Sequence, residues 1–381
     1  MMRKKVLVVF GTRPEAIKMA PVVHQLEKYT HLIETKVCVT AQHRKMLDQV
    51  LDIFQIVPDF DLNIMQNDQD LHDITEKITN GMEKVLSQYQ PDLVLVHGDT
   101  TTAFVTALNA FYHKLPVGHV EAGLRSGNIY SPWPEEANRK LIAALASFHF
   151  APTLTSKDNL LKENVKGSDI YVTGNTVIDA LLWMLDRLSK EEGYKEEVEK
   201  RICTYYDKFL EGKKFILITG HRRENFGEGF IQICQAILAL AKKYPDIDFV
   251  YPVHLNPNVQ KPVYEILGGV SNVYLIEPLE YELFAYLMDK SYLVLTDSGG
   301  LQEEAPSLGK PVLVMRENTE RPEAIEAGTA KLVGTESKKI IDEVSLLIDD
   351  DDRYNKMSLA VNPYGDGTAA EKIVDIILKT L

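Results

Sequence analysis

The sequence lacks the hallmarks of secreted and membrane-spanning proteins. It has only three cysteines, Cys38, Cys203 and Cys234, which are far apart and form no CxxC pair. This pattern is typical of reduced thiols in the core of a cytoplasmic protein, and it argues against a disulfide framework. No stretch approaches the ~20 apolar residues of a membrane helix. The apolar run after Arg3 is short and meets Gly11, so a strand is expected there rather than a signal peptide.

Positive charge is also scarce. The 381 residues include 42 lysines and arginines against 55 aspartates and glutamates, a formal net charge of -13. No long basic run is present, so neither a nucleic acid nor an anionic membrane surface is expected as a partner. Hydrophobic residues make up 45% of the chain and charged residues 25%, which is typical of a globular protein. The length exceeds one ordinary core, so two domains are expected.

Several familiar cofactor and catalytic motifs are absent. The first predicted strand is not followed by G-x-G-x-x-G, and the chain has no Walker motif and no H-E-x-x-H. A bound NAD, a P-loop ATPase and a zinc site are therefore disfavoured, and we expect neither a cofactor nor a metal. The Asp297-Ser298-Gly299-Gly300 segment also occurs around the nucleophile of trypsin-like proteases. Without disulfides or a G-x-S-x-G elbow, a hydrolase is rejected.

Apolar runs alternate with helical segments along the whole chain. In the first half, helices separate strands expected at residues 3–10, 35–40, 93–96, 117–120, 148–151 and 170–172. In the second half, strands are expected at residues 215–219, 249–252, 273–276, 292–296 and 312–315. Such alternation predicts doubly wound parallel sheets, so the fold class is α/β. The linker between the domains is placed near Gly174.

Acidic residues follow two neighbouring predicted strands of the first half. Asp99 comes after residues 93–96, and Glu121 comes directly after residues 117–120. Glu135 opens the next predicted helix. The carboxyl ends of parallel strands border one crevice, so we expect the first two acids there and the third within reach. Converging carboxylates suggest proton transfer. Each acid alone could instead cap a helix or pair with a surface base.

Cations near two strand ends suggest that a phosphorylated ligand binds. Arg13 and Lys18 lie at the start of the first predicted helix, where free N–H groups favour an anion. The alternative is that both pair with Glu15 or with solvent. His221 lies at a strand end and is followed by two arginines, where it can hold phosphate or transfer a proton.

The segment after residues 292–296 is a second candidate anion site. Ser298, Gly299 and Gly300 are predicted to begin a helix, and their small size lets phosphate approach the backbone N–H groups. Glu304, one turn further, could accept hydrogen bonds from ribose hydroxyls. Arg321 is the cation nearest in sequence to this helix start. Residues and spacing alone thus predict a two-domain α/β enzyme for a phosphorylated ligand, which we expect to be a nucleotide.

Eight sequence blocks carry a family resemblance. They are FGTRPEAIKMAP, VHGDTTT, GHVEAGLRSG, SPWPEEANR, GHRRENFGE, TDSGGLQEEAPSLGKPVLVMR, TERPEAIEAGT and NPYGDG, in this order. With them, nearly the whole chain resembles the non-hydrolysing bacterial UDP-N-acetylglucosamine 2-epimerases. The resemblance implies two Rossmann-like domains facing a cleft, as in GT-B glycosyltransferases. We therefore expect an N-terminal domain of residues 1–173 with the final helix 366–381, and a UDP-binding domain of residues 174–365.

The resemblance also implies roles for matching residues. The catalytic group would be Asp99, Glu121, Glu135 and His221. The substrate and its diphosphate would contact Arg13, Lys18, Phe284, Ser298, Gly299, Gly300, Glu304 and Arg321. A second UDP-N-acetylglucosamine, bound beside the substrate as an activator, would contact Gln42, Glu136, Arg222 and His254. Lys45 and Asp68 depart from the family pattern, and an acid near a diphosphate predicts weakened activation.

The implied reaction inverts C2 of the sugar and gives UDP-N-acetylmannosamine for cell-surface polysaccharide synthesis. The family eliminates UDP to leave 2-acetamidoglucal and then adds UDP back on the other face. A cytoplasmic homodimer is the family expectation. Three alternatives remain, namely a GT-B glycosyltransferase, a hydrolysing epimerase and a sugar-nucleotide-binding regulator without chemistry. Binding a diphosphate needs no set of three carboxylates, which argues against the regulator.

Overall fold

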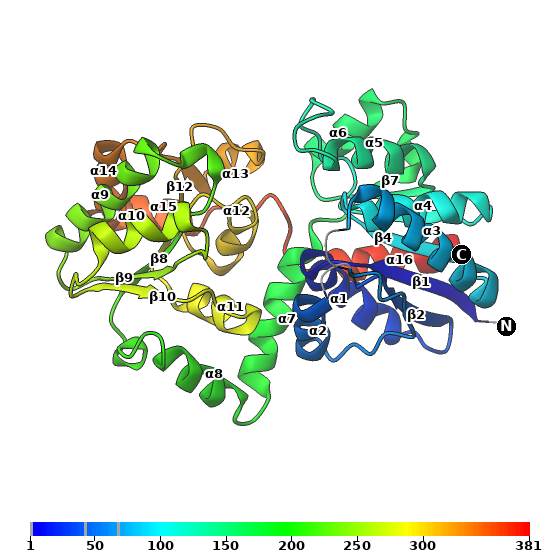
Figure 1. Cartoon of the computed structure of the whole chain (residues 1–381), viewed down its shortest axis with the longest axis horizontal. Helices are drawn as coiled ribbons and strands as arrows, with labels where there is room; N and C mark the ends of the chain where they lie inside the picture. The colour runs from blue at the N-terminus through cyan, green and yellow to red at the C-terminus, as the bar shows by residue number, and fades with distance from the viewer. Residues whose placement is uncertain (1–2, 42–43, 67–68) are drawn as a thin grey trace. The chain divides into compact units, whose positions relative to one another are not determined.

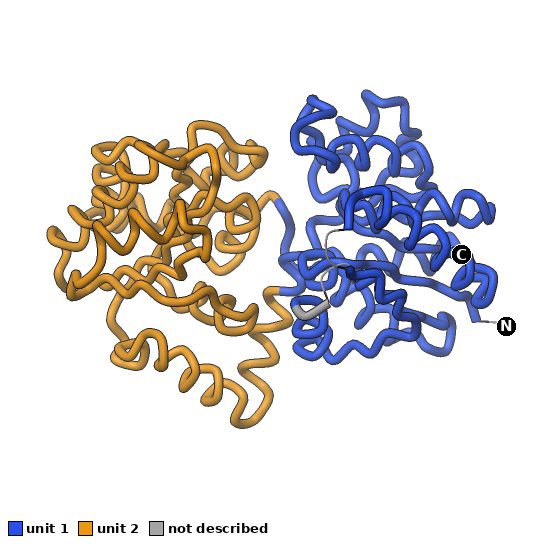
Figure 2. Tube along the Cα trace, viewed as in Figure 1, with its two compact units in different colours: residues 1–180, 364–381 blue, residues 181–363 orange. Residues whose placement is uncertain are grey.

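The computed structural model describes residues 3–41, 44–66 and 69–381 (Figure 1). The chain forms two compact units, which Figure 2 distinguishes by colour: unit 1 is Met1–Ala180 with Tyr364–Leu381, and unit 2 is Leu181–Pro363. The first boundary falls inside helix α7 (Thr176–Lys190), whereas the expected linker lies just before this helix. Buried α7 residues lie on both sides of the boundary, among them Val177 and Met184. A continuous helix of this kind gives no loop-like sequence signal.

Unit 1 is built on a seven-stranded parallel sheet with the order β3-β2-β1-β4-β5-β6-β7. Its strands are β1 (Lys4–Phe10), β2 (Ile33–Val39), β3 (Phe60–Asp61), β4 (Leu93–His97), β5 (Val117–Val120), β6 (Phe148–Ala151) and β7 (Ile170–Val172). Strands β4 and β5 are buried throughout, which explains their unbroken apolar character. The prediction missed only β3 in this sheet. That edge strand has two residues, too few to show a pattern.

The helices of unit 1 cover this sheet. They are α1 (Arg13–Glu27), α2 (Arg44–Ile53), α3 (Leu71–Tyr89), α4 (Thr101–Tyr112), α5 (Glu135–Leu145), α6 (Leu154–Lys162), the start of α7, and α16 (Ala369–Thr380). The final helix α16 packs against α1, so the two ends of the chain lie in the same unit (Figure 1). The Ala370 N–H donates to the Asp179 carboxylate at 2.8 Å and ties α16 to the start of α7.

Unit 2 repeats this arrangement with a six-stranded parallel sheet of order β10-β9-β8-β11-β12-β13. Its strands are β8 (Phe215–Thr219), β9 (Asp248–Pro252), β10 (Val273–Ile276), β11 (Leu293–Thr296), β12 (Val312–Val314) and β13 (Ala330–Leu332). Its helices are α8 (Tyr194–Cys203), α9 (Glu228–Lys243), α10 (Pro257–Leu267), α11 (Tyr281–Lys290), α12 (Leu301–Glu304), α13 (Pro322–Glu326), α14 (Ser337–Asp349) and α15 (Asp351–Ser358). The prediction missed the edge strand β13. It also began α12 at Ser298, three residues too early.

Strand order fixes where each unit can bind a ligand. In unit 1 the chain reverses its direction across the sheet between β1 and β4, and in unit 2 between β8 and β11. Ligands of open α/β sheets bind beyond the carboxyl ends of the strands at such switch points. The loops after these four strands therefore mark the candidate sites. Of the helices in the described ranges, none combines the length and the apolar character that a membrane span requires.

Three histidines are buried on neighbouring strands of unit 1. His97 ends β4, His119 lies in β5, and His149 lies opposite His119 in β6. Burial lowers the pKa of His97 and of His149 to about 4, and it lowers the pKa of His119 to about 3. All three imidazoles are therefore neutral in the folded protein at neutral pH.

These histidines predict a loss of stability in acid. The unfolded chain protonates imidazole near pH 6.5, whereas the pKa of His119 in the folded chain is about 3, so the folded state loses stability as the pH falls through this window. In His119→Gln an amide replaces the ring nitrogen that lies 2.7 Å from the Gly98 carbonyl oxygen. Between pH 7 and pH 5, urea unfolding should show that wild type loses roughly 1–2 kcal/mol more than this variant.

His72 provides the control for this experiment, because its side chain is 97% exposed. The His72→Gln variant should keep the pH dependence of wild type. Identical pH dependence in wild type, His119→Gln and His72→Gln would show that burial of His119 does not oppose its protonation.

Candidate active site

Glu121 is the centre of the first cluster of site residues in unit 1. It directly follows β5, and its side chain is only 8% exposed. The Lys18 ammonium from α1 forms an ion pair with Oε2, and Asn175 Nδ2 donates to the same oxygen at 2.8 Å. The backbone of Glu121 has φ 63°, in the left-handed region that few non-glycine residues adopt. Such strain persists only where the surrounding contacts enforce it, so this carboxylate is held in a fixed position.

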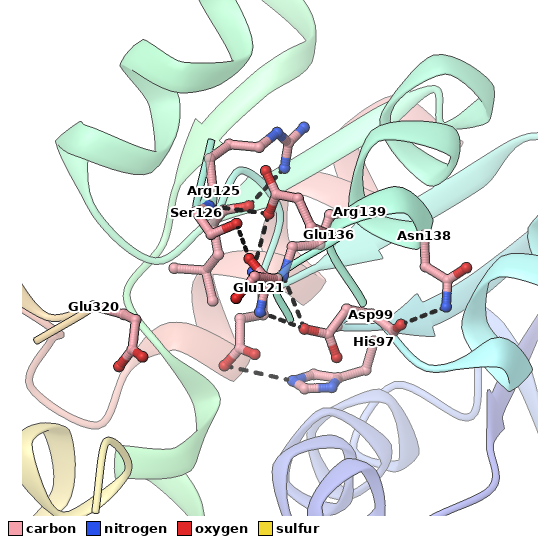
Figure 3. Close-up of polar contacts among 12 residues, drawn as sticks. His97, Asp99, Glu121, Arg125, Ser126, Glu136, Asn138, Arg139 and Glu320 are labelled. Carbon is pink, nitrogen blue, oxygen red and sulfur yellow. Dashed lines mark hydrogen bonds and ion pairs between the residues drawn. The ribbon is translucent and has the colours of Figure 1, made fainter. Parts of the chain in front are cut away.

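His97 lies beside this carboxylate and is almost fully buried. Its Nε2 is 3.8 Å from Oε2 of Glu121, which is too long for a hydrogen bond (Figure 3). Within the described part of the chain, neither ring nitrogen makes a hydrogen bond. Buried polar atoms are usually paired, because leaving one unpaired costs about 1–3 kcal/mol. A neutral imidazole in this position can either donate a hydrogen bond to a neighbouring carboxylate or accept a proton from a neighbouring carboxylic acid.

Asp99 is the centre of a second cluster, after β4. Its carboxylate accepts a hydrogen bond from Nε of Arg139 of α5 at 2.8 Å, and Nη2 of the same guanidinium forms an ion pair with it at 2.6 Å. The same guanidinium reaches the fully buried Glu136 at 3.2 Å (Figure 3). Glu136 also accepts two backbone N–H groups, from Ser126 and Gly127. The residue expected at an activator site therefore shares an arginine with an expected catalytic acid.

The three predicted catalytic acids do not have equal surroundings. Asp99 and Glu121 follow adjacent parallel strands, and each has a cationic partner. Glu135 lies in the first turn of α5, where its Oε2 is buried and, among the described residues, has no hydrogen-bond partner. His97 connects the first two acids electrostatically, since both carboxylates oppose the effect of burial on its pKa.

The two predicted anion-binding cations of unit 1 lie on the first turns of α1. The sequence left open that Arg13 and Lys18 pair with Glu15. The structure shows instead that Lys18 pairs with Glu121, while Glu15 accepts hydrogen bonds from Gly11 and from two threonines. Arg13 is half-buried at the first position of the helix.

Unit 2 contains a cavity of about 310 Å³ beyond the carboxyl ends of β8 and β9. It is lined by predicted residues from the catalytic, substrate and activator groups: His221, His254, Phe284, Ser298 and Glu304. The rings of His221 and His254 are stacked, with centroids 5.3 Å apart and an angle of 14° between their planes. The structure thus brings His254, expected at the activator, together with residues expected at the substrate.

His221 is held by a buried acid that sequence reasoning did not select. The side chain of Asp297 is fully buried and accepts the backbone N–H groups of His221 and Arg222, both at 2.8 Å. Its Oδ1 lies 3.5 Å from Nδ1 of the imidazole. Burial lowers the pKa of His221, although the negative charge of Asp297 opposes this effect.

Other predicted residues of unit 2 lie near this cavity without lining it. Gly299 lies beside Arg222, because a Cβ added there would be 3.6 Å from the guanidinium. A Cβ on Gly300 would be 3.5 Å from the Glu304 carboxylate. Arg321 forms an ion pair with the buried Glu303. Gln42 and Asp68 lie outside the described residues, as does the side chain of Lys45.

Several residues of these clusters escaped sequence reasoning. Arg139 had a detectable signal, since it follows Glu135 by four positions and shares its helix face. Asn175 had none, because it lies 54 residues after the Glu121 carboxylate that it contacts. Asp297 was read as part of a protease-like sequence segment rather than as the acid that fixes His221.

Comparisons with known proteins identify the family of this chain. A family model described as UDP-N-acetylglucosamine 2-epimerase matches residues 24–378. The chain belongs to this family. The epimerase of Campylobacter jejuni is 62% identical over 378 residues, 99% of this chain and 98% of the relative. That of Escherichia coli K12 is 59% identical over 373 residues, 98% of each chain.

Solved structures of epimerases share the fold. UDP-GlcNAc 2-epimerase from Neisseria meningitidis, bound to UDP-GlcNAc, is similar with a TM-score of 0.88 and 56% identity over 99% of this chain and 100% of that one. The Methanocaldococcus jannaschii enzyme, in complex with UDP-GlcNAc and UDP, gives a TM-score of 0.77 and 34% identity over 98% and 99% of the two chains. The predicted class, two Rossmann-like parallel α/β sheets of GT-B type, is confirmed.

The arginine that joins Asp99 to Glu136 should be important for stability in this epimerase-family chain. In Arg139→Met, one buried and one partly buried carboxylate lose their guanidinium, and urea unfolding should reveal a loss of about 2–4 kcal/mol. Arg139→Lys should retain only part of the free energy of unfolding that Arg139→Met loses, because an ammonium cannot reproduce the planar contact of a guanidinium with two carboxylates.

A surface pair serves as the matched control. Arg3 is 52% exposed and lies 3.5 Å from Glu34, so Arg3→Met should cost less than about 1 kcal/mol. Equal losses in Arg139→Met and Arg3→Met would mean that the Arg139 cluster stabilises no more than an ordinary surface ion pair.

Proposed function

We propose that this chain interconverts UDP-N-acetylglucosamine and UDP-N-acetylmannosamine by inverting C2 of the sugar. Membership of the epimerase family and its relatives of about 60% identity support this function. The observation that carries the proposal is the pair of partly buried carboxylates, Asp99 and Glu121, at adjacent strand ends of unit 1. A protein that only bound the nucleotide sugar would need no such acids.

The chemistry requires an indirect route, because the C2 hydrogen is not α to a carbonyl. In the elimination, a carboxylate takes the C2 proton, the C2–H electron pair forms the C1–C2 double bond, and the C1–O bond breaks with its electrons leaving on UDP. The intermediate is 2-acetamidoglucal. In the reverse addition, an acid protonates C2 on the opposite face, and a UDP oxygen bonds again to C1. Two proton-transfer groups on opposite sides of the ring are thus required.

We assign these proton transfers to the set of Asp99, Glu121 and Glu135. Lys18 and Arg139 compensate the negative charge of the first two, so both acids can be ionised in a partly buried site. The third acid, Glu135, has a buried carboxylate oxygen that makes no hydrogen bond to any described residue. Either of the ion-paired carboxylates can then take the C2 proton.

We assign the UDP moiety to unit 2. Phe284 offers an apolar wall for the uracil, and Glu304 can accept hydrogen bonds from the ribose in the same cavity. The diphosphate would lie along the loop from Ser298 to Gly300, with His221 close by. The Arg222 guanidinium, which lies beside Gly299, can stabilise the negative charge that develops on the departing UDP. Arg13 and Arg321 are proposed as further contacts of the substrate.

The experiment that tests this function is proton NMR of the protein with UDP-N-acetylglucosamine in D₂O. We expect UDP-N-acetylmannosamine to appear with deuterium at C2, which shows C2–H cleavage and epimerisation together. Accumulation of free N-acetylmannosamine with UDP would identify a hydrolysing enzyme instead. No reaction until an acceptor is added would identify a glycosyltransferase.

The three acids are tested by neutral isosteres. Asp99→Asn, Glu121→Gln and Glu135→Gln should each lower kcat at least about 100-fold, since each loses a proton-transfer group, while the Kd for UDP changes less than about threefold. Glu76→Gln, on the exposed face of α3, is the control and should keep wild-type turnover. Near-normal turnover in all three site variants would remove the basis of the proposed mechanism.

Regulation and context form a further part of the proposal. We propose a cytoplasmic homodimer that supplies cell-surface polysaccharide synthesis and is activated by its own substrate, with Glu136, Arg222 and His254 contributing. The initial rate should then rise sigmoidally with UDP-N-acetylglucosamine concentration. A hyperbolic rate curve over the whole range would exclude this activation.

A further inference from the structure

The first loop of unit 1 encloses a carboxylate where a phosphate commonly binds in α/β folds. Strand β1 ends at Phe10, and α1 begins at Arg13. The backbone N–H groups of Gly11 and Thr12 both donate to Oε2 of Glu15, at 3.0 and 2.8 Å. The Thr12 hydroxyl donates to the same oxygen at 2.8 Å. N–H groups at a helix start are natural anion donors, and here the anion is a side chain of the helix itself.

The other oxygen of Glu15 reaches the neighbouring loop. Oε1 accepts the Thr100 hydroxyl at 2.6 Å, and Thr100 directly follows Asp99. The same hydroxyl oxygen caps α4 by accepting the Ala103 N–H at 3.0 Å. Glu15 therefore joins the loops after β1 and β4, which flank the switch point of the sheet. Its contribution is therefore to the position of the Asp99 loop.

The surroundings pack closely around this loop. Glu15 is 2% exposed. Gly11 is so closely packed that an added Cβ would lie 2.1 Å from the Thr40 hydroxyl and 2.5 Å from that of Thr102. Those two hydroxyls are themselves hydrogen-bonded at 2.9 Å. The donors of the loop thus converge on one fixed point, which the Glu15 carboxylate occupies.

In unit 2 a carboxylate also accepts the N–H groups of the first-strand loop, but it comes from a different loop. The backbone N–H groups of His221 and Arg222, in the loop after β8, donate to the fully buried Asp297. That acid comes from the loop after β11 rather than from the helix that follows the first strand. In both units an internal carboxylate therefore fills the first-strand loop, and a phosphate would meet both an occupied space and a like charge there.

We propose that Glu15 is a positioning and specificity-determining residue of the proposed epimerase reaction. It occupies the anion position of the β1–α1 loop, which keeps a phosphate group out of that position and fixes the loop that carries Asp99. This role rests on the proposed function, whereas the anion position itself can be tested without it.

The test uses Glu15→Ala with formate, a carboxylate small enough to enter the space that the side chain leaves. Formate should raise the melting temperature of this variant with saturable dependence and leave that of wild type unchanged. In the same titration, formate should restore kcat at least tenfold from a value about 100-fold below wild type. A folded Glu15→Ala protein that responds to formate in neither measurement would overturn the proposal.

Glu15→Gln is the second variant, and it decides the matter if Glu15→Ala does not fold. The amide fills the space, its oxygen can accept the Gly11 and Thr12 donors, and its NH2 group can donate to the Thr100 hydroxyl oxygen, but it carries no charge. Its kcat should fall at least tenfold with KM changed less than threefold, and formate should not restore it, because the site is filled. Wild-type kcat in Glu15→Gln would show that the charge of Glu15 is irrelevant.

Asp350 supplies the matched control for helix capping alone. Its carboxylate accepts the Arg353 N–H at the start of α15, in unit 2. Asp350→Ala should lose some stability but keep kcat, and formate should change neither. If wild type shows no epimerisation, the proposed function fails, while the melting-temperature response of Glu15→Ala still reports on the anion position.

Discussion

Unit 1 must hold several carboxylates close together at the ends of neighbouring strands, and its other contacts follow from this constraint. Like charges at short range oppose ionisation unless cations or hydrogen-bond donors compensate them. Each acid has its own compensation. Glu121 has Lys18 and Asp99 has Arg139, whereas the hydrogen bonds that Glu15 accepts within the described ranges come from backbone and hydroxyl groups. The kind of partner therefore differs with the position of each acid.

This difference separates acids that can react from an acid that holds the scaffold. The Asp99 side chain is 24% exposed, so a substrate can reach it. Glu15 is 2% exposed, and burial raises its pKa even though four hydrogen bonds oppose the shift. Such a group exchanges protons poorly with a ligand but orients every donor around it. Reactivity and positioning are thus divided between acids of one loop region.

The sequence was sufficient to predict doubly wound parallel sheets and the ends of most strands, because these features depend on local periodicity. Strands β5 and β6 have the predicted bounds, and Asp99 and Glu121 follow adjacent strands as expected. Edge strand β3 was missed because two residues show no period, and β13 because its three residues, Ala-Lys-Leu, include only one buried side chain. The partners of the acids were harder to predict from the sequence. Arg139 lies 40 residues from Asp99, and such contacts arise only when the sheet assembles.

The absent glycine fingerprint of the first strand now has a physical explanation. Glycines in G-x-G-x-x-G let a pyrophosphate approach the backbone closely. A loop that already holds the carboxylate of Glu15 needs no such approach, so Thr12 and Arg13 can stand where a nucleotide-binding loop requires small residues. Asp297 removes the same need in unit 2. The glycines appear instead at Gly299 and Gly300, beyond β11. The distribution of glycine and internal carboxylate along the chain therefore indicates which loops can admit phosphate.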